Sequence, residues 1–284
     1  MTPHRVRGSV LIVAALAALA SRAPAQSPER PLLVLSMGAG YVTGGSIWRL
    51  DRQYALVFPP VTSGEVDSVA LGRLFRPGFE AGLGVTLFRS PHIGLSAEIS
   101  FLGISTESRC SPLGPFAADS RNVNERACVD IQGKLIRTSA AAFQAGATWR
   151  PAAEARVQPY LRAVGGLALL GGSFVETGGV VAVPPASGDT ARASFVSQVF
   201  LADQDRRELT WVATLALGVT MEAGPGTQLR FEVRDIMTNV SSVTGPGDHL
   251  SSPPFAQVGS RTVHLLALTV ALDLVLERQR TRRY

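Results

Sequence analysis

The chain has 284 residues, of which 46% are apolar and 17% charged, and its formal net charge is +5. After residue 25 there is no run of about eighteen apolar residues, which excludes membrane-spanning helices. Without Arg5, Arg7 and Arg22 the charge falls to about +2, and residues 26–276 alone carry about −1. A nucleic-acid-binding protein would spread basic side chains over a binding face, so this class is excluded as well.

The N-terminus has the three parts of a secretory signal peptide. Arg5 and Arg7 make the start basic, residues 10–20 form an apolar run, and the sequence A-P-A at 23–25 is a cleavage site. The apolar run is well short of the ~20 residues that a spanning helix needs. We therefore predict a signal peptide over residues 1–25, export from the cytoplasm, and a mature chain that begins at Gln26.

Eight segments after this leader alternate apolar with small or polar side chains. In the clearest of them, Phe79, Ala81 and Leu83 alternate with Glu80 and Gly82. A period of two residues is the pattern of a β-strand with two different faces. The eight segments lie at about 32–41, 79–88, 93–101, 135–149, 160–174, 210–222, 228–234 and 266–274.

The links between these segments alternate in length. Three short links contain turn residues, at 90–92, 151–158 and 223–227. Four long links separate them, at 44–77, 106–133, 175–208 and 239–260. Outer-membrane barrels have the same asymmetry, with short periplasmic turns and long extracellular loops. The pattern therefore predicts an all-β fold over residues 26–276: an eight-stranded antiparallel up-and-down transmembrane β-barrel with three short periplasmic turns and four long extracellular loops.

The composition of the two strand faces indicates which one points outward. A soluble lipocalin-like barrel would have an apolar cavity and a polar exterior. Here the polar face consists mainly of Gly, Ala, Ser and Thr with isolated charges, which suits a narrow lumen, and the other face is almost entirely apolar. Trp149 and Trp211 lie toward strand ends, where interfacial aromatic residues are expected. The expected lumen charges are Glu98, Arg162, Arg230, Glu232, Arg234 and Asp273.

Through this pattern the mature chain resembles the eight-stranded outer-membrane families typified by the transmembrane domain of outer-membrane protein A, often described as porin family or outer membrane β-barrel. The resemblance implies an outer-membrane location. One feature departs from it. Such barrels usually end on an aromatic residue, whereas the last strand here ends at Val275 and Leu276 and an arginine-rich tail over 277–284 follows. We expect this tail to be a solvated end, with contact to anionic lipid headgroups or periplasmic partners as the alternative.

Cys110 and Cys128 are the only cysteines, and they lie between two expected strands. Because an exported chain meets an oxidising compartment, we predict a disulfide between them. Closing a loop of this size stabilises a chain by ~3 kcal/mol in the chain-entropy model.

An eight-stranded barrel has an interior filled by side chains, so a general diffusion pore is not expected. For the lumen charges we favour an ion-paired plug that stiffens the barrel over a gated polar path. The aromatic residues of the long links, such as Trp48, Phe75 and Phe200, pack locally or contact another surface; the sequence leaves both possibilities open.

An enzyme of the lipid A deacylase or palmitoyltransferase kind needs His with Ser and an acid. His264 follows Ser260 by four residues, and Glu80 or Glu98 is a conceivable acid, but the His-x-Ser-Asn motif is absent. No phosphate-binding loop or metal-ligand spacing occurs, so we expect no catalysis, no cofactor and no metal. The favoured interpretation is that His264 has an ordinary hydrogen-bond partner or lies at the membrane interface.

The sequence therefore predicts a structural or surface-interaction protein of the outer membrane. Its expected partners are membrane lipid and lipopolysaccharide, the barrel-assembly machinery, and an extracellular ligand at the long loops, with no nucleic acid. The alternatives are a conduit for small hydrophobic molecules, as in barrels resembling outer-membrane protein W, and, less favoured, a lipid A-modifying hydrolase.

Overall fold

The structure is a computed structural model that describes residues 32–56, 66–114, 122–183, 194–203, 209–248 and 253–276. The predicted signal peptide and the basic tail lie outside these residues. Eight long strands form the main body: β1 (Leu32–Gly44), β3 (Val66–Phe88), β4 (Ile93–Pro112), β5 (Leu135–Trp149), β6 (Val157–Gly171), β9 (Leu209–Gly224), β10 (Thr227–Gly245) and β11 (Gln257–Leu276).

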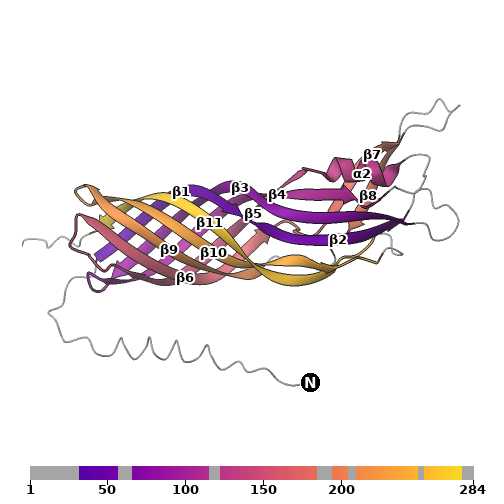
Figure 1. The fold of residues 1–284 in the computed structure, drawn as a ribbon. Helices are drawn as coiled ribbons and strands as arrows, with labels where there is room; N and C mark the ends of the chain where they lie inside the picture. Colours follow the sequence, from indigo (N-terminus) through magenta and orange to yellow (C-terminus); the bar gives the residue numbers. More distant parts are fainter. Residues whose placement is uncertain are drawn as a thin grey trace, which may run out of the picture.

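These strands close into a barrel in which every neighbouring pair is antiparallel (Figure 1). Closure occurs at β1, where Leu35 is opposite Leu274 of β11 on one side and Val85 of β3 on the other. Short connections join β3 to β4, β5 to β6 and β9 to β10 at one end, which we call the turn end. The first residue of β1 and the last of β11 also lie there, and the opposite end is the loop end. The predicted eight-stranded up-and-down barrel is confirmed.

The outer wall near the turn end is a belt of exposed apolar side chains. Leu83 is 62% exposed and Leu217 64% exposed, although both lie in the middle of long strands. On β4 the outward set runs over alternate residues within 93–101, a length that matches the ~9–11 residues with which a tilted strand crosses a bilayer. The predicted direction of the apolar face is therefore correct for this belt, whose exterior suits contact with lipid.

Toward the loop end the two faces of the strands exchange character. On β4, Leu102 and Ile104 point inward and are buried, whereas Glu107 and Arg109 point outward. The same exchange occurs on β11, where Leu265 is buried and His264 is exposed. The small, polar interior predicted for the eight segments thus does not extend to this end. Here the strands bury apolar side chains between them, as in a water-soluble sheet packing.

The described parts of the four long links contain regular secondary structure, which corrects the extent of the predicted strands. Strands β3, β4, β10 and β11 extend well beyond the belt, and four further elements lie in the links: β2 (Ser46–Leu56), α2 (Val123–Ile131), β7 (Thr177–Val183) and β8 (Ser194–Leu201). A β-bulge between Arg76 and Phe79 puts one extra residue into β3, so the alternation changes phase there. Pro77 occupies the bulge, one of the few places in a sheet where proline is tolerated. In the described part of the chain, no helix is long and apolar enough to cross a membrane.

Candidate functional site: the barrel interior

Charged side chains from several strands meet at mid-height inside the belt. Arg162 of β6 contacts Glu98 of β4 at 2.9 Å and Glu232 of β10 at 2.6 Å. Arg234 of β10 contacts the same two carboxylates, at 2.9 Å and 3.2 Å. Each of these four side chains is at most 7% exposed. Two guanidinium groups and two carboxylates therefore link three strands across the lumen.

The two remaining expected charges join this group more loosely. Arg230 lies 3.7 Å from Asp273 of β11 and 3.7 Å from Glu232. All six expected lumen residues are therefore buried and ion-paired. We call them, together with Glu80, the ion-pair layer.

Glu80 is the member that the sequence interpretation missed as a lumen charge. It lies on β3, is 2% exposed and pairs with Arg234. Its alternation with the outward residues Phe79 and Ala81 already places it on the same face as Gly82. That signal was sufficient to identify it.

The ion-pair layer fills the lumen where it lies. Two cavities that adjoin it inside the barrel have volumes of only about 20 and 10 Å³. That these ion pairs act as a stiffening plug stays a prediction.

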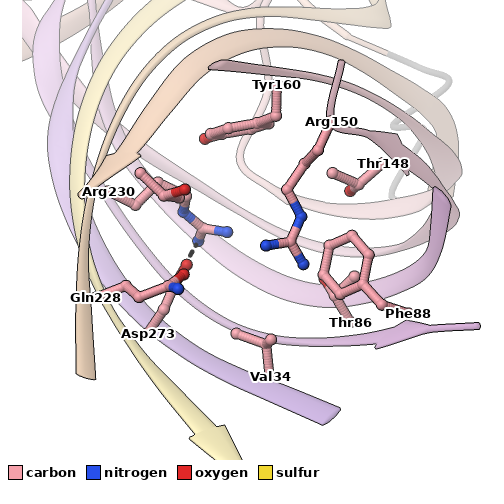
Figure 2. A pocket seen from close by; sticks show the side chains of 10 residues that line it. Val34, Thr86, Phe88, Thr148, Arg150, Tyr160, Gln228, Arg230 and Asp273 are labelled. Atoms are coloured by element: carbon pink, nitrogen blue, oxygen red, sulfur yellow. Dashed lines mark ion pairs between the residues drawn. The ribbon is translucent and has the colours of Figure 1, made fainter. Parts of the chain in front are cut away.

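Between the layer and the turn end lies the first of these cavities, which we call the inner turn-end cavity (Figure 2). Arg150, which follows β5, reaches into it with its guanidinium carbon 3.3 Å from the centre of the Phe88 ring. Its Nη1 donates to Oε1 of Gln158 at 3.0 Å. Burial lowers the pKa of Arg150 to about 10, while Asp273 acts in the opposite direction. Arg150 was not predicted, because it directly follows the expected strand rather than lying within it.

The loop-end interior is closed by residues 172–177, which we call the plug segment. Arg73 of β3, 1% exposed, donates to the carbonyl oxygen of Ser173 at 3.1 Å. Trp48 of β2 donates from Nε1 to the carbonyl oxygen of Phe174 at 2.6 Å. Burial lowers the pKa of Arg73 to about 10, opposed by Glu176 and then Asp203. The plug segment is thus held by side chains from the opposite wall.

The aromatic residues of the predicted long links divide accordingly. Trp48, Phe75 and Phe200 are buried, which supports local packing for them, and Phe75 meets Phe174 edge-on. Phe195 of β8 is instead 76% exposed.

One side of the loop end lacks a backbone ladder between neighbouring strands. The pairing of β1 with β11 ends at Gly44 and Leu265. Beyond that point β2 pairs only with β3 among the described strands, which leaves an unpaired boundary between β2 and β11 that we call the seam. Side chains bridge this seam: Arg261 donates to the carbonyl oxygen of Ile47 at 3.0 Å. Gln53, fully buried, accepts from the backbone N–H of Gly247 at 2.8 Å.

The other predicted residues lie outside the lumen. Cys110 at the end of β4 and Cys128 in α2 form the expected disulfide. Trp149 and Trp211 face outward, 51% and 43% exposed, near the turn end and the loop end of the belt respectively.

His264 is on the outer wall, where its Nδ1 lies 3.0 Å from a carboxylate oxygen of Asp235. Glu80 and Glu98 are inside the barrel, so the considered grouping of His264 with either of them is not formed. Across the described residues, no group of three or more His, Cys, Asp or Glu is arranged to hold a metal ion.

Comparison with known proteins yields similarity to solved structures alone. No family model and no curated protein matches the chain. Neisserial surface protein A matches with 12% identity over 87% of this chain and 99% of its own, at a TM-score of 0.40. The outer membrane protein OprG from Pseudomonas aeruginosa matches with 9% identity over 89% and 100%, at 0.42.

The outer membrane protease OmpT from Escherichia coli matches with 11% identity over 90% and 99%, at 0.40. Similarities of this degree carry no argument about activity, and the fold rests on the strand pairings described above.

Proposed function

We propose that this chain is an integral outer-membrane barrel with a structural or surface-interaction role and without catalysis. The observation that carries the proposal is the combination of an exposed apolar belt with a lumen filled by the ion-pair layer. A continuous exposed apolar surface of this kind is suited to contact with lipid rather than water. The filled lumen favours a stiff scaffold over a pore.

In this arrangement the turn end faces the periplasm and the loop end faces outward. Lipid and lipopolysaccharide surround the belt, and the barrel-assembly machinery inserts the chain. The loop end supports a surface role, because α2, β7 and β8 present exposed apolar residues above the belt. Val129 is 71%, Val180 52% and Phe195 76% exposed. An extracellular protein or glycan ligand would bind there.

Fractionation of expressing Gram-negative cells tests the location. We expect the chain in the outer membrane, with faster gel migration before boiling than after it. A soluble periplasmic product would refute the proposal. In planar bilayers the purified barrel should give no stable conductance steps.

A conduit for small hydrophobic molecules is the second candidate, favoured by the seam and the apolar loop-end interior. Under this alternative, Trp48→Ala would loosen the plug segment and speed the uptake of a hydrophobic solute by cells. Trp149→Ala, the same change on the outer wall, is the matched control. Equal uptake by wild type, both variants and cells without the protein favours the structural role.

A further inference from the structure

The inner turn-end cavity brings two arginines close to a single lining carboxylate, Asp273. Arg150 and Arg230 both point into it, as Figure 2 shows. Among the described residues, no carboxylate lies within 4.0 Å of Arg150, whose partners are Gln158 and the Phe88 ring.

Arg230 is paired less tightly than its neighbours in the ion-pair layer. Its two carboxylate contacts, with Asp273 and Glu232, are both 3.7 Å. Arg162 and Arg234 instead make contacts of 3.3 Å or less. Asp273 is the carboxylate that lines the cavity, and it lies 3.7 Å from Arg230.

A second observation points to a ligand in the same cavity. Tyr160, a residue that is 3% exposed, lines the cavity, and its hydroxyl has no hydrogen-bond partner among the described residues. The Nε atom of Arg150 likewise has no hydrogen-bond partner in the described part of the chain, and that of Arg230 has only the 3.7 Å ion pair with Glu232. Buried polar groups are rarely left unsatisfied, because each costs about 1–3 kcal/mol. Two unused donors, on Tyr160 and Arg150, therefore belong to residues that line one small space together with Arg230.

We propose that this cavity is a binding site for a small oxyanion, a carboxylate or phosphate group, admitted from the turn end. The oxyanion accepts hydrogen bonds from the guanidinium groups of Arg150 and Arg230 and from the hydroxyl of Tyr160. Guanidinium is the side-chain group best matched to carboxylate and phosphate oxygens.

Access and size agree with this assignment. A second cavity of about 310 Å³ lies at the turn end and shares Phe88, Arg150 and Gln228 with the inner one. The inner cavity accepts only the charged oxygens, and the outer one has room for the rest of the molecule that carries them. The ion-pair layer closes the far side, so the oxyanion binds without crossing the barrel.

Calorimetric titration of the purified full-length barrel in neutral detergent tests the site. Acetate and inorganic phosphate are titrated separately at constant ionic strength, with sodium chloride as the reference titrant. We expect saturable binding at millimolar concentrations, at least tenfold weaker in Arg150→Gln and several-fold weaker in Tyr160→Phe. Arg109→Gln, which removes a charge from an exposed loop-end side chain, should bind as wild type does.

The outcomes separate clearly. Binding of both anions with the expected variant effects supports a general oxyanion site. Binding of one alone supports the proposal and identifies whether the site takes a carboxylate or a phosphate. No heat beyond the chloride reference overturns the proposal, as does equal weakening by Arg109→Gln. Tyr160→Phe retains the ring and both arginines, so it decides the matter if Arg150→Gln fails to fold. The titration is made in detergent, so its result is independent of the role in the membrane.

Discussion

Glu98 connects the two tightest arginines of the lumen, since Arg162 and Arg234 both contact its carboxylate. In a space with little water, this carboxylate and the two guanidinium groups compensate each other's charge. Removing one member of a buried pair costs more than the pair contributes, because the remaining charge stays buried without a counterion.

We therefore expect Glu98→Gln to lower the free energy of unfolding by about 3–5 kcal/mol. Asp51→Asn, which breaks an exposed pair with Arg49, should change it by less than about 1 kcal/mol. Urea unfolding of the detergent-solubilised barrel measures both. Equal effects would mean that the ion-pair layer is exchanging with solvent.

Gly218 allows the Tyr160 ring to lie against the inner wall. A Cβ at this glycine would lie 2.4 Å from the carbonyl oxygen of Phe231 and 2.5 Å from the Tyr160 hydroxyl. We expect Gly218→Ala to destabilise the barrel by about 1–3 kcal/mol through overpacking. Gly224→Ala, where nothing lies within 4 Å, is the control in the same denaturation experiment. A harmless Gly218→Ala would show that both the Tyr160 ring and the neighbouring β10 backbone shift easily.

The position of the plug segment depends on Arg73. Arg73→Met keeps an unbranched side chain, although a shorter one, and removes every donor to Ser173 and Glu176. We expect protease cleavage in the plug segment to become at least tenfold faster while the belt strands stay intact. Arg49→Met, at a side chain that is 79% exposed, should leave the digestion pattern unchanged. Mass spectrometry of the fragments locates the cuts.

The disulfide ties the end of β4 to α2, away from the belt. Reducing it should destabilise this loop-end region by about 3 kcal/mol in the chain-entropy model and leave the barrel closed. Hydrogen exchange is the suitable measurement, with faster exchange expected in α2 and β7. Faster exchange throughout the belt strands would contradict this local role.

The elements also explain what the sequence could predict. The belt strands could be predicted from the sequence because their outward residues contact lipid. This contact requires apolar residues at every second position, as at Leu83 and Val85. The loop-end strands were missed because the apolar residues exchange faces and the bulge at Pro77 shifts the phase. Helix α2 was not predicted, because it spans only nine residues within a link between two expected strands.

In the site, the six expected charges follow from the same alternation, and Glu80 could have been added to them. Arg150 and Tyr160 could not be placed in one cavity from the sequence. Their meeting depends on how far the strands coil around the barrel, which no local pattern encodes.

The belt runs around the whole barrel and is the surface that a bilayer would cover. We expect Leu268→Lys, at a side chain 55% exposed in the belt, to cost about 2–4 kcal/mol of folding free energy in lipid vesicles. Thr262→Lys lies on the same outer face of β11 beyond the belt and should cost about 1 kcal/mol or less. Equal costs would place the bilayer at a different height.

The exchange of faces along the strands also fixes the thickness of membrane that the molecule tolerates. A barrel with apolar walls along its full height could shift upward or downward to match a thicker hydrocarbon layer. Here the outward residues beyond the belt on β4 are first small (Gly103, Ser105) and then charged (Glu107, Arg109), so a thicker bilayer would have to thin around the protein. Hydrophobic mismatch of this kind sorts proteins between membranes, and the bacterial outer membrane is thinner than average. Short-chain lipids should therefore be the better host for refolding.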